Sequence, residues 1–197
     1  MADKADITIE VLRQLIAIDE QTSLMTWKAR DEGFFKSPAL AKAWNYQWAG
    51  KPLGLSTNPI GYQKVGILKV NFMAHRVVFA LIKGRWPDGD IDHINRNKKD
   101  NRIENLREVT PTQNNCNVGL TKANTSGFKG VSWVKKSNKW RVAIRHGNKN
   151  IWLGQYDDIE KAAEAYATAS AKYHKEFGYV PYSDMLDKRA ALRRRVK

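Results

Sequence analysis

The stretch from Asp90 to Asn115 (DIDHINRNKKDNRIENLREVTPTQNN) constrains the fold more than any other part of the chain. It opens on Asp90–His93, which predicts a short strand, and the polar residues 95–101 predict a turn-rich loop. Leu106–Val109 predicts a second short strand. The sequence therefore predicts two short strands joined by a polar loop.

A helix is predicted directly after the second strand. Thr110 fits its N-cap, Pro111 fits its first helical position, and Gln113 completes a capping box with Thr110. This start places Asn114 in the first turn of the helix. Asn114 is therefore expected to face back toward the end of the strand.

Four side chains of this stretch form a candidate catalytic site. Asp92 supplies a carboxylate, His93 an imidazole, and Asn105 and Asn114 supply amides. Carboxylate and amide oxygens suit Mg²⁺ or Mn²⁺. A neutral imidazole, whose reference pKa is about 6.5, can take a proton from water. The set predicts hydrolysis of a phosphodiester with a single divalent metal.

The residues before this stretch predict a few short elements. These are a helix at Ile9–Ala17 capped by Thr8 or Asp6, a strand at Ser23–Lys28, a hairpin of residues 61–67 and 68–72, and a helix at Ala74–Lys83 that ends at Gly84. Residues 30–60, which are rich in Gly, Pro and Ser, give no clear pattern.

A second unit is predicted from Phe128 onward. Its expected strands are Lys129–Lys135, Lys139–Arg145 and Asn150–Tyr156, with turns at Ser137–Asn138 and His146–Asn148. On the middle strand, apolar residues alternate with Arg141, Ala143 and Arg145, so one face is apolar and the other cationic. An Ala-rich helix is expected at residues 158–175, with Asp157 and Glu160 as its capping pair.

Charge is distributed unevenly over the 197 residues, whose formal net charge is +14. No acidic residue lies between Glu108 and Asp157, whereas eight Lys and Arg residues do. These basic residues are interleaved with Trp133, Trp140 and Trp152. The combination predicts a surface that binds a polyanion.

The single cysteine, Cys116, excludes an intrachain disulfide and a zinc site built from several thiolates. We expect it to be a small buried residue on its helix. The longest apolar run, Val77–Ile82, is too short to span a membrane, and the sequence shows no signal peptide. The protein is therefore expected to be cytoplasmic.

Residues 74–118 resemble the HNH endonucleases of phages and mobile introns, whose active site is a ββα-metal fold. By this resemblance Asp92 matches the metal-binding acid and His93 the general base. Asn105 matches the central Asn that braces the loop carrying the base. Asn114 stands where many members have His, as in the H-N-N variants of intron-encoded nicking enzymes, and is the second metal ligand.

Residues 126–178 resemble the AP2/ERF DNA-binding domain, in which a three-stranded sheet backed by one helix enters the major groove. The resemblance assigns DNA contacts to Lys129, Ser132, Arg141, Arg145, Asn150 and Trp152. Ser132 and Asn150 stand where the family often has Arg. Base preference therefore cannot be transferred from plant AP2 proteins.

The predicted fold class is α+β. Its parts are an N-terminal α+β region (1–72, with possible DNA contacts), an HNH nuclease core (73–120), a linker (121–127), an AP2-like domain (128–180) and a basic tail (181–197). The tandem resembles a phage-type HNH homing endonuclease, which implies a monomer that acts on double-stranded DNA without a membrane or protein partner. Within the loop, phosphate contacts are expected from Arg96, Lys98, Lys99 and Arg102.

Two other functions compete with a nicking endonuclease. One is a DNA-binding regulator in which the HNH-like part is only a scaffold, but the intact set of Asp92, His93, Asn105 and Asn114 disfavours it. The other is a sequence-tolerant RNA-binding protein, which would explain the charge but not the metal-binding pattern.

Overall fold

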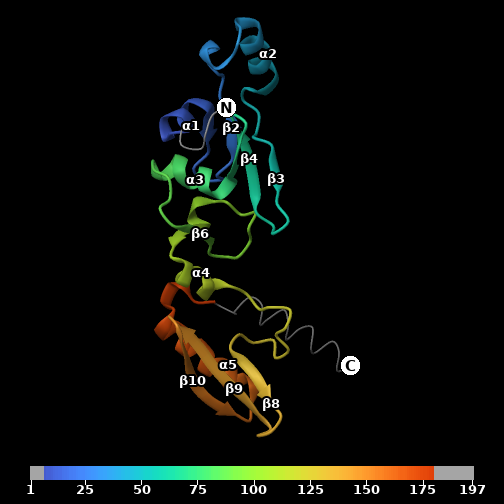
Figure 1. The fold of residues 1–197 in the computed structure, drawn as a ribbon, viewed down its shortest axis with the longest axis vertical. Coiled ribbons are helices and arrows are strands. Elements are labelled where there is room, and N and C mark those ends of the chain that lie inside the picture. Colours follow the sequence, from blue (N-terminus) through green and yellow to red (C-terminus); the bar gives the residue numbers. More distant parts are fainter. Residues whose placement is uncertain (1–6, 180–197) are drawn as a thin grey trace. The chain divides into compact units, whose positions relative to one another are not determined.

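The computed structural model describes residues 7–179, and the chain divides into two compact units, Met1–Val109 and Thr110–Lys197 (Figure 1). The division falls inside residues 73–120, which the sequence pattern groups into one nuclease core. The basic tail at 181–197 and the alternative cap Asp6 lie outside the described residues.

The first unit contains three α-helices, seven strands and two 3₁₀ turns among its described residues. In chain order they are α1 (Ile9–Leu15), β1 (Ile16–Ile18), β2 (Met25–Trp27), η2 (Glu32–Phe34), α2 (Pro38–Trp48), β3 (Leu55–Thr57), β4 (Gln63–Ile67), β5 (Val70–Met73), α3 (Ala74–Lys83), β6 (Asp90–His93), η3 (Ile103–Asn105) and β7 (Leu106–Val109). The strands form three antiparallel sheets, β1–β2, β3–β4–β5 and β6–β7.

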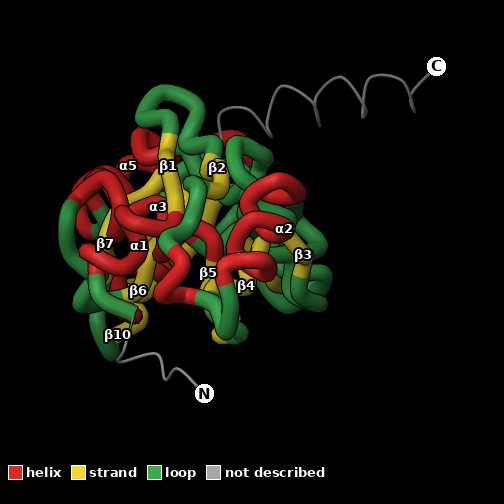
Figure 2. Tube along the Cα trace, turned by 90° about the horizontal axis from the view of Figure 1, so that it is seen from above, coloured by secondary structure: helices red, strands yellow, loops and turns green. Residues whose placement is uncertain are grey.

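The core of this unit forms around α1 and α3, which lie together (Figure 2). Leu12 and Leu15 of α1 and Val77 and Val78 of α3 are fully buried there. Thr8 caps α1 as predicted, but the helix ends at Leu15 rather than at Ala17. The chain continues as β1, whose pairing with β2 takes residues that the apolar period assigned to the helix.

The predicted hairpin and the helix after it are confirmed at β4, β5 and α3. Leu68 and Lys69, the two residues between the strands, both have positive φ, at 48° and 68°. This is the backbone of a tight two-residue turn that matches the twist of the strands. Gly84 ends α3 in the left-handed conformation, at φ 71°, as the sequence predicts.

The second unit begins with the helix α4 (Pro111–Asn117), whose capping box of Thr110 and Gln113 is present as predicted. Its remaining elements are β8 (Val131–Val134), β9 (Lys139–His146), β10 (Lys149–Tyr156), α5 (Ile159–Tyr173) and η4 (Lys175–Phe177). The three strands form one antiparallel sheet with β9 in the middle. They overlap the predicted ranges 129–135, 139–145 and 150–156.

Helix α5 packs its small side chains on the sheet. Ala162, Tyr166 and Ala169 are buried against Val142 and Ile144 of β9. Gly130 shows how close this packing is, since a Cβ there would lie 2.2 Å from the ring of Tyr166. No side chain larger than that of glycine fits here.

Two expectations about the second unit are wrong. The cap of α5 is Asp158 and not Asp157, because Asp158 Oδ1 accepts the backbone N–H groups of Glu160 and Lys161. Cys116 is only partly buried, and its thiol lies 3.3 Å from the carbonyl oxygen of Thr112. The buried residue of α4 is Asn117, so the inner face of this short helix is polar.

Candidate functional site

Asp92 is held by a cross-strand partner on the β6–β7 hairpin. The register pairs it directly with Arg107, and residues directly opposite each other point to the same face. Arg107 donates to Asp92 Oδ2 from Nε (2.9 Å) and from Nη2 (2.7 Å). Both side chains are largely buried, with 9% of Asp92 and 16% of Arg107 exposed. Asp92 is therefore a buried carboxylate whose charge is balanced by a guanidinium.

His93, the next residue, ends β6 and contacts a different set of groups. Its Nε2 lies 3.1 Å from Asn101 Oδ1, and the amide of Asn101 donates to Gln63 Oε1 at 2.7 Å. Because this bond fixes the Asn101 amide, its oxygen faces His93, so Nε2 carries the proton in the neutral ring. Burial lowers the pKa of His93, although the Asn101 bond and Asp92 oppose the shift. The imidazole is therefore neutral at pH 7, with Nδ1 as its basic nitrogen.

Asn105 fastens both ends of the loop that follows His93. Its Oδ1 accepts the backbone N–H of Asn95 at 2.9 Å, and its Nδ2 donates to the carbonyl of Asp100 at 2.7 Å. Its own carbonyl accepts the N–H of Ile94 at 2.9 Å. Asn105 is buried, so these bonds are shielded from water. The geometry supports a bracing role for this residue.

The four basic residues of the loop differ in their surroundings. Arg102 pairs with Asp100 and Glu104, and Lys98 donates to the carbonyl of Ile60 at 2.9 Å. Arg96 is partly buried with φ 64°, whereas Lys99 is exposed. Among these four, Lys99 is the side chain best placed for a phosphate.

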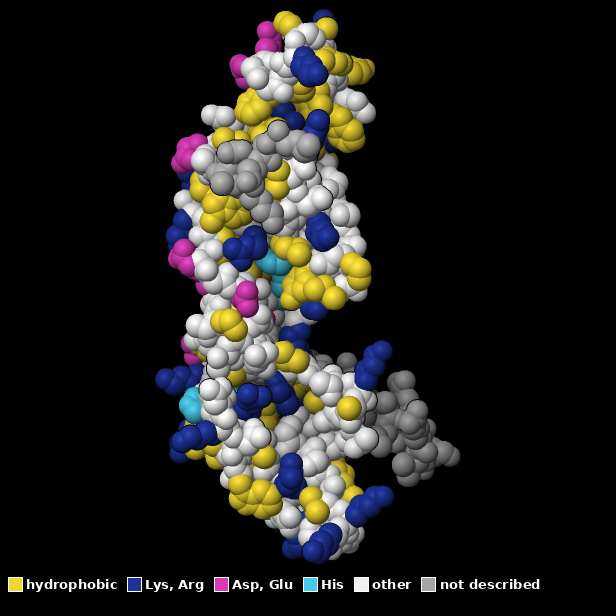
Figure 3. All heavy atoms as spheres, viewed as in Figure 1, with side chains coloured by type: hydrophobic (Ala, Val, Ile, Leu, Met, Phe, Trp, Pro, Cys, Tyr) yellow, Lys and Arg dark blue, Asp and Glu magenta, His cyan; other side chains and the backbone are white. Residues whose placement is uncertain are grey.

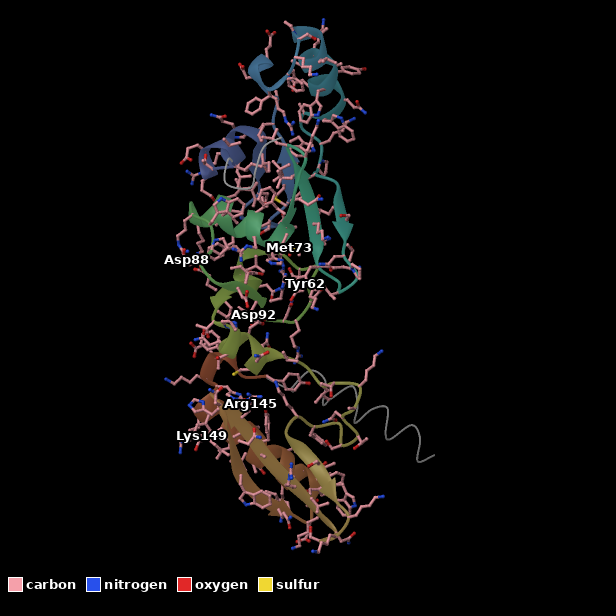
Figure 4. All side chains as sticks on the ribbon, viewed as in Figure 1. Tyr62, Met73, Asp88, Asp92, Arg145 and Lys149 are labelled. Carbon is pink, nitrogen blue, oxygen red and sulfur yellow. The ribbon has the colours of Figure 1, made fainter. Side chains whose placement is uncertain are left out.

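Sequence reasoning missed an aromatic cluster around the imidazole. His75 of α3 and Tyr62, which precedes β4, both face His93, with ring centroids 5.1 and 5.7 Å away. Figure 4 labels Tyr62 and Asp92 in this part of the first unit. Gln63 and Asn101 were also missed as its neighbours. Residues 62 and 63 reach the surroundings of His93 through the hairpin β4–β5, and no local sequence motif indicates this proximity.

His75 should make the stability of the fold depend on pH. Burial lowers its pKa from 6.5 to about 4, so the folded state holds it neutral. Between these two values the unfolded chain binds more protons, and the contribution of His75 is lost as the pH falls. The loss should reach about 3 kcal/mol by order of magnitude. Chemical denaturation of the wild type and of His75→Phe at several pH values should show that the free energy of unfolding depends less steeply on pH in the variant. Equal slopes would contradict this.

Asn114 lies in the first turn of α4, in the second unit, where it is partly buried. Lys129 attaches α4 to that unit, since its ammonium donates to the carbonyls of Cys116 (2.8 Å) and Val118 (2.6 Å). These bonds satisfy carbonyl groups that a helix end leaves without partners. The ammonium of Lys129 is thus engaged by the end of α4.

The other residues of the second unit that are predicted to contact DNA share one face of the sheet. Ser132 and Asn150 lie directly opposite Arg141 and Arg145, and Trp152 lies opposite Ala143. Because opposite residues point the same way, all five predicted side chains are on the face away from α5. All five are exposed, Trp152 to 57%. The face is flat, cationic and carries one large aromatic ring.

Metal ligands are sparse among the described residues. No group of three His, Cys, Asp or Glu side chains within residues 7–179 is arranged to hold a metal ion. A site built from one carboxylate and amide oxygens would not form such a group. In the same part of the chain, no helix has the length and apolarity needed to span a membrane.

Comparison with known proteins shows which family this chain resembles. Residues 72–116 match the family model described as HNH endonuclease, and they include all four motif positions. "Protein 3.8" of Escherichia phage T7 is 36% identical over 95 residues, which are 48% of this chain and 78% of that protein. "Uncharacterized HNH endonuclease L560" of Acanthamoeba polyphaga mimivirus is 32% identical over 158 residues, 77% of each chain. No solved structure matches the chain significantly.

Two independent findings agree, a family model that spans the strand–loop–strand–helix motif and a viral relative aligned over most of both chains. The chain therefore belongs to the HNH endonuclease family.

Proposed function

We propose that this protein is a site-specific, metal-dependent DNA endonuclease of the homing type that cuts one strand. The observation that carries the proposal is the setting of His93. A neutral imidazole is held by Asn101, follows a buried carboxylate, and begins a loop that Asn105 fastens at both ends. This is the preorganisation that a general base needs.

His93 acts as the base toward the attacking water. With Nε2–H donating to Asn101, the lone pair of the ring is on Nδ1, which takes the proton. The bond from Asn101 to Gln63 keeps the amide oxygen of Asn101 turned toward the ring. When His93 becomes charged, the negative charge of Asp92 stabilises the imidazolium through electrostatic attraction.

The residues fit a hard divalent cation, Mg²⁺ or Mn²⁺. Asp92 offers carboxylate oxygens, and the family motif gives Asn114 as a second oxygen donor; no thiolate takes part. When bound, the ion supplies positive charge for the scissile phosphate and the departing oxygen. Arg107 already balances the charge of Asp92, so the cation has to compete with this guanidinium.

We infer that the sheet β8–β10 recognises the DNA. Support comes from the shared exposed face of Ser132, Arg141, Arg145, Asn150 and Trp152, and from the lack of acidic residues between Glu108 and Asp157. A sheet of this kind can enter a major groove, as in the AP2-like proteins that the sequence resembles. Arg141 and Arg145 are the candidates for reading bases.

A plasmid assay separates the candidate functions. The full chain is incubated with supercoiled plasmid in Mg²⁺, in Mn²⁺ or in EDTA. An endonuclease converts the plasmid only with metal. A DNA-binding regulator shifts its mobility without cutting in any buffer, and an RNA-binding protein prefers an RNA duplex in competition. Either of the last two results would refute the proposed function.

The products should also show how many strands are cut. One His93 supplies one base, so a monomer is expected to cut one strand in each binding event. Open-circle plasmid should then accumulate before any linear form. Linear product that forms first, with a steep dependence on protein concentration, would instead indicate a dimer that cuts both strands.

A further inference from the structure

Residues 28–51 of the first unit form an arm that projects from its core. The ends of the arm meet at Trp27, whose N–H donates to the carbonyl of Lys51 (2.9 Å) and whose carbonyl accepts from Gly50 (2.7 Å). Between Met25 and Leu53 no residue belongs to the buried cluster around α1 and α3, and Ala41 of α2 is buried outside that cluster. The arm, which includes η2 and α2, therefore contributes little to the stability of the core.

The base of the arm is held together by a guanidinium between two tryptophan rings. The Arg30 guanidinium lies 3.8 Å from the ring centre of Trp44 and 4.7 Å from that of Trp27. The two tryptophans meet edge to face at 5.8 Å. The side chain of Asn45 exchanges two hydrogen bonds with the backbone of Arg30. These contacts fix the orientation of α2.

The outer surface of the arm combines aromatic and basic side chains. Tyr46 is 93% exposed and Trp48 is 40% exposed. Lys36, Lys42 and Lys51 are also exposed. At the end of the first unit that carries α2, Figure 3 shows hydrophobic and basic side chains together with acidic ones.

The acidic residues of the arm are confined to its start, at Asp31 and Glu32. No acidic residue occurs between Glu32 and Asp88, whereas eight Lys and Arg residues do. On α2, Lys42 and Tyr46 are four residues apart and therefore adjacent on one face. Ala39 and Ala43 flank them, and such small side chains allow a large partner to come close. The excess of basic over acidic residues is complementary to a polyanion, and the exposed ring of Tyr46 suits contact with a sugar or a base edge.

We propose that the α2 arm is a second DNA-binding surface, on which Lys36, Lys42 and Lys51 contact phosphates of the duplex beside the cleavage point and Tyr46 packs against its groove. This rests on the proposed function, since it takes DNA as the substrate. It adds a contact that neither the nuclease motif nor the sheet β8–β10 provides. The arm would widen the footprint on one side of the cut.

The test measures binding of the full chain to a random-sequence duplex of a few helical turns, in EDTA, over a range of salt concentrations. Lys42→Gln should lower the slope of log affinity against log salt by about 0.9, and the triple Lys36, Lys42 and Lys51 to Gln variant by about three times as much. Tyr46→Ala should weaken binding severalfold. The thermal unfolding midpoint should stay unchanged, because these side chains are exposed.

Two matched controls address less specific effects. Lys83→Gln removes an exposed lysine from α3. The DNA affinity of this variant and the salt dependence of its binding should match those of the wild type. Leu24→Ala removes another exposed apolar side chain, 52% accessible, and should also leave binding unchanged. A slope change in Lys83→Gln equal to that in Lys42→Gln would overturn the proposal, because it would reflect net charge alone.

Three further outcomes would also overturn it. Wild-type affinity in the triple variant and in Tyr46→Ala would show that the arm does not touch DNA. A change in sedimentation of the free protein without a change in DNA binding would make the arm a contact between copies of this chain. If the wild type binds no duplex at all, the proposed nuclease function fails as well, whereas in the first two cases it stands.

Discussion

Replacing His93 with alanine is expected to reduce the rate of plasmid nicking at least about hundredfold, because a positioned general base contributes about 10²–10⁴-fold. Binding of the duplex should remain close to that of the wild type. His93 is 3% exposed and its ring lies against those of Tyr62 and His75, so its loss removes little that could bind a phosphate. Single-turnover rates and equilibrium binding, measured on the same preparation, separate the two effects.

The matched control for this variant is His146→Ala. His146 is an exposed histidine at the end of β9, and its removal should leave the nicking rate unchanged. Thermal unfolding of both variants shows whether the cavity left by His93 disturbs the fold. Wild-type nicking by His93→Ala would show that another group is the base.

Replacing Arg107 with methionine is expected to destabilise the first unit by about 3–5 kcal/mol, because it leaves the Asp92 carboxylate buried without its countercharge. The matched control is Arg102→Met. This change likewise removes an arginine that pairs with carboxylates, here Asp100 and Glu104, but the Arg102 side chain is 49% exposed. Because the Arg102 guanidinium is half exposed, water can replace part of its pairing with Asp100 and Glu104, so this variant should lose less stability than Arg107→Met. Urea denaturation in EDTA compares the three proteins.

Divalent metal should partly restore the Arg107→Met variant. If Asp92 is a metal ligand, Mn²⁺ replaces the missing positive charge, and a ligand that binds only the folded state raises its stability. The unfolding midpoint of Arg107→Met should therefore rise more with Mn²⁺ than that of the wild type or Arg102→Met. Equal shifts in all three proteins would contradict the assignment of Asp92.

Sequence patterns predict local elements well in this chain. They fail where the structure of a segment depends on contacts with residues far away in the sequence. Three predicted features depend only on neighbouring residues, and all three are present: the β6–β7 hairpin, the capping box at Thr110 and the end of α3 at Gly84. The end of α1 depends instead on a distant segment, because pairing with β2 places Ile16–Ile18 in a strand. Local propensity cannot anticipate a partner strand.

The same limit applies to the site. Asp92, His93 and Asn105 are visible in the sequence because they share one hairpin and its loop. Their neighbours Gln63 and His75 come from β4 and α3 and carry no motif, so only the tertiary fold brings them to His93. The arm was missed for a related reason. Its order depends on Arg30 between Trp27 and Trp44, and a cation stacked on two rings has no periodic pattern.

The most direct measurement starts the reaction with metal. The full chain is first bound to supercoiled plasmid in metal-free buffer, and Mg²⁺ or Mn²⁺ is then added while samples are quenched with EDTA. We predict that open-circle DNA appears only after the metal is added and that no linear form precedes it. A plasmid that stays supercoiled with both metals, while the protein remains bound to it, would contradict a metal-dependent nuclease. Cutting before any metal is added would contradict it equally.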